Sequence, residues 1–556
     1  MKFIARLSVL ALVLLAGCDD STRLQGGPGS SGGSIVIATT AEPDALFPPI
    51  TTTLQGRQVT ELLFDNLAQV GIKMNTLGDE GFEPRLAKSW VWSGDSLSIA
   101  FSLDPAARWH DGKPVRAQDV VFSFSTYTDS TVGSPTAVQL AQIDSVSAKD
   151  SVTAVVWFKK KYPRQFYDAA SQMLILPEHV YSAGRDSITK KAGTHDPVGS
   201  GRFRFGTWKR SESLTLVADT SNYRGRPGVG RVQFVIAPEF TTALTKFLTG
   251  EADVFEALRP EDLVSIAKNP SLKVVRLPGM AYVFMQFNLR DPKNPRKRNE
   301  MFSNKAFRRA LSMALDRDAM VKNVFDSLAQ VSIGPTVSTY PTTPRTLPKI
   351  PFDTVTAGRI LDSLGWRDSN GDGVRDRSGK DLSFSILVPS SSKSRQRMAV
   401  LIQEQLRRVG VKASIETLDF PALMQRQADR DFETMLWAWQ LTPSPSGLRQ
   451  TWSSASARNA SGSNFGSYEN PTFDAYVDSA LAATSLARSA HLFGQAYRII
   501  LEEAPAIWLY EPETVLGVHA RIKTLPMRPD AWWLGIADWT IPASERIARD
   551  RVPSGR

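Results

Sequence analysis

The sequence predicts a mixed α/β protein of at least two lobes. A strand, a helix and a second strand follow one another within residues 382–418, and β-rich stretches recur at 96–103 and 152–158. The chain has 556 residues, of which 42% are hydrophobic, so it can bury more than one core. No repeat of solenoid period is visible, which leaves a multi-lobed globular chain as the expected class.

The first strand is expected at residues 34–38. These residues alternate and then become continuously apolar, which is typical of a core strand. Pro43 and Pro49 bound a loop directly behind it. Loops that follow core strands commonly face a ligand, so this loop is a candidate cleft segment.

The clearest unit lies between residues 382 and 418. Apolar residues alternate over 382–388, recur at helical spacing over 398–409 and alternate again over 411–415, and Gly410 ends the helix. Short connections make this unit a right-handed parallel crossover, whose ligand edge lies at the carboxyl ends of the strands. A further amphipathic helix is expected over residues 307–315, with Ser303 as its cap.

The single cysteine, Cys18, ends a short leader. A charged start precedes an apolar run at residues 7–15, and Ala16 and Gly17 stand before the cysteine. The run is shorter than the roughly 20 residues that span a bilayer. Residues 1–17 therefore predict a lipoprotein signal peptide, with Cys18 as the lipid attachment site. The alternative is a free core cysteine behind an ordinary cleaved signal.

Residues 18–33 predict a flexible tether because glycine and serine dominate them. The mature chain is thus expected outside the cytoplasm, held to a membrane by acyl chains. In Gram-negative bacteria, acidic residues at the positions of Asp19 and Asp20 resemble the signal that retains lipoproteins in the inner membrane. The expected location is then the periplasmic side of that membrane.

The net charge does not point to a nucleic-acid partner. The chain carries a formal charge of +10, but lysine and arginine are dispersed among 56 acidic residues. The only dense basic run, residues 296–298, lies beside Pro295 and Asn299 in an expected loop. We expect a solvated surface, no nucleic acid and a monomer, with attraction to anionic lipid headgroups as a weaker alternative.

Residues 83–124 contain three short motifs in a fixed order. They read Leu86-Ala87-Lys88-Ser89-Trp90, Trp109-His110-Asp111-Gly112-Lys113-Pro114 and Ala117-Gln118-Asp119-Val120. This segment resembles the extracytoplasmic solute-binding proteins of family 5, which serve ABC importers of oligopeptides, dipeptides and nickel. Further motifs at 197–203, 248–253, 307–317, 464–474 and 504–510 follow in the family's order. The resemblance therefore covers the chain from about residue 35 to beyond 530.

The resemblance implies a periplasmic-binding-protein fold with a ligand cleft between two lobes, an inserted small domain and hinge closure on the solute. It divides the chain into a first lobe from residues 34–78, 197–277 and 522–556, an inserted domain at 79–196 and a second lobe at 278–521. It also implies a peptide or peptide-like solute as ligand, an ABC permease with its ATPases as partner, and no enzymatic activity.

The expected ligand site departs from that of peptide binders. Those proteins anchor the peptide amine on an aspartate where this chain has Thr442, and a threonine cannot neutralise an ammonium. Dipeptide binders also carry an arginine for the ligand carboxylate just past the strand that here ends at Val388. Lys393, Arg395 or Arg397 are possible substitutes here.

Aromatic residues complete the predicted ligand-binding set. Trp437 and Trp439 lie two apart at the end of an expected strand, so both face the same side. They could sandwich a planar or sugar-like ligand, form the wall of a peptide pocket or simply fill the core, and for Trp437 we favour the core. Tyr282 and Asn288, which stand in the family's order and spacing, are also predicted to bind ligand.

Residues 368–373 imitate the start of a calcium-binding loop. Position twelve is Gly379 rather than a glutamate, so we expect a turn without metal. The five histidines are scattered, which disfavours nickel, and no cofactor is expected. Two other functions stay open: a membrane-anchored sensor or chaperone on the same fold, and a secreted hydrolase. The hydrolase is disfavoured because the only Gly-x-Ser-x-Gly match, residues 29–33, falls in the tether.

Overall fold

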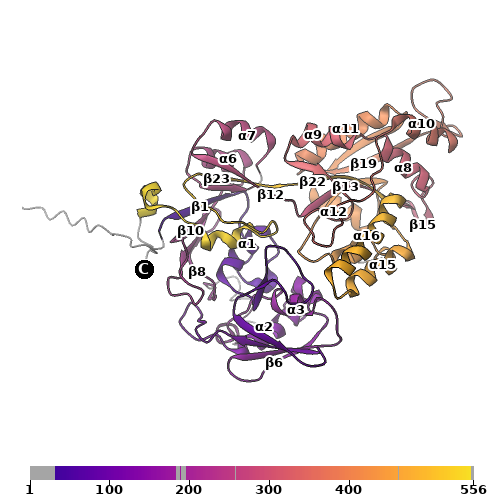
Figure 1. Ribbon diagram of the computed structural model, residues 1–556. Helices are drawn as coiled ribbons and strands as arrows, with labels where there is room; N and C mark the ends of the chain where they lie inside the picture. Colours follow the sequence, from indigo (N-terminus) through magenta and orange to yellow (C-terminus); the bar gives the residue numbers. More distant parts are fainter. Residues whose placement is uncertain (1–31, 183–187, 189–195, 257, 461, 552–556) are drawn as a thin grey trace, which may run out of the picture.

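The computed structural model describes residues 32–182, 188, 196–256, 258–460 and 462–551 (Figure 1). The predicted signal peptide, the predicted lipid attachment site Cys18 and nearly all of the tether lie outside these residues. Among the described residues, no helix combines the length and apolar character that crossing a membrane requires.

A seven-stranded sheet forms around β1 (Ser34–Thr39), which confirms the strand predicted at residues 34–38. Every residue of β1 is buried, because parallel neighbours flank it on both sides. The strands follow the order β12 (Leu272–Leu277), β23 (Thr514–His519), β11 (Val254–Glu256), β1, β10 (Arg231–Ile236), β9 (Ser213–Ala218) and β8 (Phe203–Lys209). Helices α6 (Phe240–Leu248) and α7 (Pro260–Ala267) lie beside this sheet (Figure 1).

A buried ion cluster ties distant segments to this sheet. Asp253, which is fully buried, accepts a hydrogen bond from the backbone N–H of Val36 (2.9 Å) and pairs with the guanidinium groups of Arg521 (2.8 Å) and Arg549. Arg521 also pairs with Asp550, which accepts from the backbone N–H of Ser34 at 2.7 Å. Residues near 35, 253, 521 and 550 are thereby held together.

A six-stranded sheet forms the centre of the second lobe. Its strands follow the order β16 (Ala329–Val331), β22 (Ala506–Pro512), β13 (Ala281–Phe287), β21 (Thr434–Gln440), β19 (Ser383–Pro389) and β20 (Lys412–Leu418). Helices cover its faces: α8 (Lys305–Met313), α9 (Arg317–Phe325), α10 (Thr354–Ser363), α11 (Lys393–Arg407), α12 (Phe420–Ala428), α13 (Gly447–Trp452), α14 (Ser454–Arg458), α15 (Pro471–Ala482) and α16 (Leu486–Glu503).

The predicted crossover unit is confirmed within this sheet. β19 and β20 pair in parallel, and α11 connects them. Gly410 ends the connection with a φ of 77°, a conformation that favours glycine. The helix predicted at 307–315 is α8, but its predicted cap is wrong: Asn304, not Ser303, accepts from the backbone N–H groups of Ala306 and Phe307.

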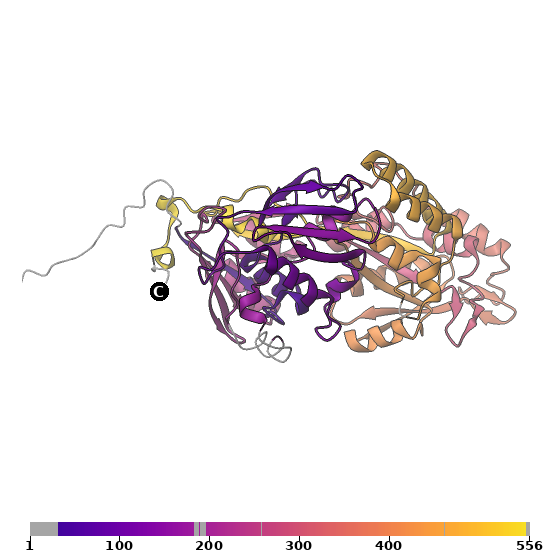
Figure 2. The same cartoon turned by 90° about the horizontal axis from the view of Figure 1, so that it is seen from below.

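Within residues 79–196, a four-stranded antiparallel sheet carries the third structural unit. Its order is β4 (Ala87–Trp92), β5 (Ser98–Leu103), β7 (Thr153–Phe158) and β6 (Ile143–Ala148). Helices α2 (Ala117–Thr128), α3 (Gln165–Ala170) and α4 (Glu178–Tyr181) belong to the same unit. It lies at the bottom of Figure 1 and in front in Figure 2, which is seen from below.

Two short connections join the large sheets. One runs from β12 to β13 and the other from β22 to β23, and they lie side by side: a Cβ on Gly279 would meet the carbonyl oxygen of Pro512 at 1.9 Å. The predicted second lobe, residues 278–521, therefore includes one strand that belongs to the other sheet. Thr514–His519 pairs with β11 and β12 of the seven-stranded sheet.

A glycine turn fixes the end of α1 (Leu54–Leu63). The backbone N–H of Gly201 donates to the carbonyl oxygen of Leu63 at 2.8 Å. A Cβ on Gly199 would meet that same oxygen at 1.8 Å, so only glycine fits there without movement. The His110 ring accepts from Gly199 N–H through Nδ1 and contacts the Gly201 carbonyl oxygen through Nε2. Burial lowers the pKa of His110 and favours its neutral form, in keeping with a structural role.

Candidate functional site

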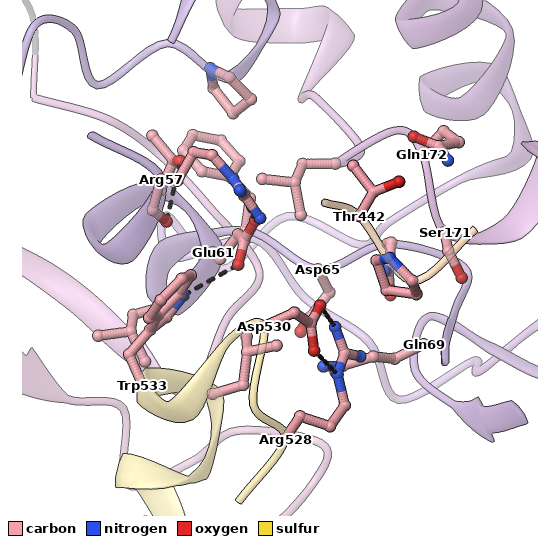
Figure 3. A pocket seen from close by; sticks show the side chains of 18 of the residues that line it. Arg57, Glu61, Asp65, Gln69, Ser171, Gln172, Thr442, Arg528, Asp530 and Trp533 are labelled. Carbon is pink, nitrogen blue, oxygen red and sulfur yellow. Dashed lines mark hydrogen bonds and ion pairs between the residues drawn. The ribbon is translucent and has the colours of Figure 1, made fainter. Parts of the chain in front are cut away.

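A cavity of about 1040 Å³ lies where all three units meet. The seven-stranded lobe contributes α1, the end of β11 and the C-terminal residues 528–538; the inserted unit contributes residues around 136 and 171; the second lobe contributes residues 440–443. Figure 3 shows side chains from these segments lining this cavity. We call this cavity the cleft.

One wall of the cleft comes from α1. Arg57 and Glu61 form an ion pair at 3.0 Å, and the second carboxylate oxygen of Glu61 accepts from the indole N–H of Trp533 at 2.9 Å (Figure 3). Glu61 raises the pKa of Arg57. Both carboxylate oxygens of Glu61 are therefore held by contacts within the first lobe.

The C-terminal segment supplies a second pair. Arg528 donates two hydrogen bonds to the carboxylate of Asp530, at 2.9 and 2.6 Å, and a third to the carbonyl oxygen of Val70 at 2.6 Å. Such a two-point contact is geometrically specific. Deeper in the same lobe, Asp65 pairs with Arg224 at 2.8 Å and accepts from the Tyr223 hydroxyl at 2.9 Å.

Thr442 lies in the cleft, where Figure 3 shows it facing the side chains of the other lobe. Its backbone carbonyl accepts from the Tyr340 hydroxyl, and two residues further on Ser444 accepts from Arg164 of the inserted unit at 2.9 Å. Thr442 is the one member of the predicted ligand-binding set that lines this cavity.

Trp437 and Trp439 do not form a sandwich. Both lie at the end of β21, but their rings meet edge to face, with an interplanar angle of 78°. Trp437 instead stacks on Phe420, and Trp439 on Phe465. Two indoles at this angle cannot enclose a planar ligand between them, so that interpretation is wrong.

Trp437 lines a smaller cavity of about 420 Å³ at the carboxyl ends of β19 and β21. Its indole nitrogen is buried and has no hydrogen-bond partner within the described part of the chain. Of the three basic residues considered as substitutes for a carboxylate anchor, Arg395 lines this cavity, whereas Arg397 pairs with Glu261 at 3.5 Å and Lys393 is exposed. Burial lowers the pKa of Arg395, although contact with Tyr510 opposes the shift.

Tyr282 and Asn288 lie in the core. Tyr282 is 1% exposed and its hydroxyl accepts from the Trp452 indole at 3.0 Å. Asn288 is also 1% exposed and donates to the carbonyl oxygens of Arg430 and Phe432. Neither residue lines either of the two cavities described here, and their contacts account for both side chains structurally.

The loop at residues 368–373 closes on itself. The carboxylate of Asp368 accepts from the backbone N–H groups of Gly371 (2.7 Å) and Gly373 (2.9 Å). These bonds describe a turn of the kind that Asn, Asp and Gly form on their own. In the described part of the chain, no group of three or more histidine, cysteine or acidic side chains is placed to hold a metal ion.

A family model decides the identity of the chain. The model of the bacterial extracellular solute-binding proteins, family 5, matches residues 81–460. The chain belongs to this family. It is also 25% identical over 552 residues to the oligopeptide-binding protein AppA of Bacillus subtilis, a match that covers 96% of this chain and 98% of that protein.

Other relatives of this solute-binding protein agree in length and fold. It is 27% identical to the probable di/tripeptide-binding protein 5 of Pseudomonas aeruginosa, over 86% of this chain and 89% of that one. The structure of AppA in complex with a nonapeptide superposes with a TM-score of 0.75 at 24% identity, covering 93% of this chain and all of that one. The two-lobed α/β class predicted from the sequence is thereby confirmed.

The sequence patterns missed most of the cleft of this solute-binding protein. Arg57 and Glu61 lie on α1, Glu256 ends β11, and Arg528, Asp530 and Trp533 come from the C-terminal segment. These residues are far apart in the chain and form no motif. One available signal was the i, i+4 spacing of Arg57 and Glu61, which places an ion pair on one helix face.

Proposed function

We propose that this chain is the substrate-binding component of an ABC importer and that it holds a peptide or peptide-like solute in the cleft. The observation that carries the proposal is the cleft itself: its roughly 1040 Å³ lies between the two lobes of a solute-binding fold. That volume is at the upper end of small-molecule pockets, so it has room for more than a single amino acid. The similarity to the oligopeptide-binding protein AppA and to the probable di/tripeptide-binding protein 5 of P. aeruginosa supports peptides as the ligand class.

The polar groups of the cleft suit a peptide backbone. Amides and hydroxyls line it between the ion pairs, and these can donate to and accept from peptide bonds regardless of the side chains. They are Gln69, Gln139, Ser171, Gln172, Gln440 and Thr442. Lipid attachment at Cys18, the inner membrane as its site, a monomeric state and delivery to a permease complete the proposal.

The cleft can be tested by blocking it. Thr442→Trp should abolish the thermal stabilisation that peptides produce, because the indole would occupy the space of the ligand. At 100 times its Kd, a ligand adds about 2.7 kcal/mol to the free energy of unfolding, which a thermal-shift assay detects. Ser394→Trp, which fills the smaller cavity, is the matched control and should leave peptide binding intact. Loss of binding in the control alone would move the site to the smaller cavity.

A second substitution tests whether the side chain at position 442 contacts the ligand amine. Thr442→Asp places a carboxylate where peptide binders carry one, so ligands with a free amine should bind more tightly by roughly 1–3 kcal/mol. Calorimetry with di-, tri- and tetrapeptides and their N-acetylated forms measures the difference. If the variant gains nothing for free amines over acetylated ones, Thr442 does not face the ligand amine.

A further inference from the structure

The charged groups that line the cleft do not balance. Six carboxylates and five guanidinium groups line it, so the wall carries one net negative charge. The carboxylates are those of Glu61, Asp65, Glu83, Glu256, Asp530 and Asp538; the guanidinium groups are those of Arg57, Arg85, Arg202, Arg224 and Arg528.

Five ion pairs account for all of these groups except one. The pairs are Arg57–Glu61, Arg85–Glu83, Arg202–Asp538, Arg224–Asp65 and Arg528–Asp530. Glu256 is the remaining group, and it has no cationic partner within the described ranges. Burial lowers the pKa of Arg528, the arginine of the C-terminal wall, but Asp530, with a smaller contribution from Glu61, more than offsets that effect.

Glu256 is held in place by neutral donors. One carboxylate oxygen, Oε2, accepts from the side-chain amide of Gln58 at 2.8 Å and from the indole N–H of Trp532 at 3.2 Å. The other oxygen, Oε1, accepts no hydrogen bond from the described residues. The side chain is therefore oriented by two fixed contacts while one oxygen stays available in a cavity wall.

A carboxylate in this setting favours a cation. Burial raises the pKa of Glu256, and the two neutral donors offset that shift only in part. A positively charged ligand group would supply the missing counter-charge and a charge-assisted hydrogen bond to Oε1. A neutral or anionic group there would leave the carboxylate uncompensated.

We propose that Glu256 is a specificity-determining residue that binds a cationic group of the ligand, an ammonium or a guanidinium. This inference rests on the proposed function and narrows the solute to one that carries such a group. It places the counter-charge in the first lobe, on β11, whereas the position of Thr442 in the second lobe is neutral. The cation is either the N-terminal amine of a peptide or a basic side chain.

Three peptides of equal length distinguish these sources. The first is N-acetylated and C-amidated with a central norleucine and is neutral; the second has a central lysine instead; the third has the norleucine and a free amine. Calorimetry on the wild type should show the second or the third peptide binding about tenfold or more tightly than the neutral one. The peptide that binds more tightly than the neutral one shows whether the cation is the basic side chain or the N-terminal amine.

Glu256→Gln should remove this preference and leave the affinity for the neutral peptide nearly unchanged, since an amide oxygen can still accept from Gln58 or Trp532. Glu256→Asp keeps the charge and should retain a preference, which separates loss of charge from loss of structure. Glu251→Gln is the control, because Glu251 is exposed, pairs with Lys246 and lies outside the cleft. Melting temperatures without ligand verify that each variant is folded.

Equal binding of all three peptides by the wild type would overturn the inference, as would a Glu256→Gln variant that keeps the preference. In either case the neutral peptide still binds, and the proposed function stands. If no peptide of any charge binds, the proposed function fails and takes this inference with it.

Discussion

The two large sheets each bury an apolar core, but they differ in the contacts at their centres. In the seven-stranded sheet, Asp253 draws three segments together through buried ionic contacts to Arg521 and Arg549 and a hydrogen bond from Val36. In the six-stranded sheet, the corresponding centre is aromatic: Phe284, Trp452 and Trp508 pack around Tyr282 with ring centroids 5.1–6.0 Å apart.

The difference follows from how each lobe is assembled. The six-stranded sheet comes from one stretch of chain between residues 281 and 512, so apolar packing is enough to bring neighbours together. The seven-stranded sheet combines pieces from the start, the middle and the end of the chain. Apolar contact is non-directional, whereas a buried ion pair requires its exact partner. The buried ion pairs thus add specificity to the choice of segments that meet in the first lobe.

The largest expected effect comes from breaking the ionic centre. Asp253→Ala leaves two arginines near a vacated, buried position, which should lower the free energy of unfolding by about 3–5 kcal/mol. Chemical denaturation measures this loss. Glu404→Ala, which removes an exposed partner of Arg407 and Arg408, is the matched control and should leave the free energy of unfolding nearly unchanged. Equal losses in the two variants would contradict the special role of the buried cluster.

Asp168 is also a buried carboxylate but, unlike Asp253, it forms no ion pair with a described residue at contact distance. Burial raises the pKa of Asp168 in α3 to about 6, while Arg164 and Tyr162 oppose the shift. Above pH 6 the native state therefore holds an ionised Asp168 at a cost. As the pH falls from 7 toward 4, the native state takes up the proton before the unfolded state does, so the free energy of unfolding of the wild type should rise.

Asp168→Asn removes this cost. At pH 7.5 the variant should be more stable than the wild type by on the order of 2–3 kcal/mol, and the difference should vanish near pH 4. Urea titrations at the two pH values test this. A difference that does not depend on pH would show that Asp168 acts through packing rather than charge.

The smallest effect is expected in the aromatic centre. Tyr282→Phe removes the acceptor of the Trp452 indole and leaves a buried donor without a partner, at a cost of about 1–2 kcal/mol. Peptide affinity should be unchanged, because Tyr282 lies in the core. Calorimetry on the folded variant checks the second point, and a large loss of affinity would restore the ligand-binding role predicted from the sequence.

Periodicity predicted the elements that local physics determines. The strand at residues 34–38 and the crossover over 382–418 are present because their apolar patterns match buried faces on both sides of a sheet. The cap of α8 was misplaced by one residue, since Ser303 and Asn304 are both good capping residues and only the backbone geometry decides between them.

The site was far less predictable. Trp437, Trp439, Tyr282 and Asn288 lie in the second lobe in regular strands or directly after them, and most of their surface packs against other core residues. The cleft instead depends on long-range ion pairs such as Arg224–Asp65, whose members have no pattern along the chain. An unpaired carboxylate like Glu256 becomes visible only when every other charge in the cavity has been matched.

The glycine turn at residues 199–201 bears on how variants of this protein would be found. A methyl group at Gly199 would force the carbonyl of Leu63 away, and Glu61 and Asp65, two residues to either side, would move with it. A substitution that touches no solute would then alter the cleft. A random-mutagenesis screen for changed ligand affinity should therefore return Gly199, which does not line the cavity, alongside the residues that do.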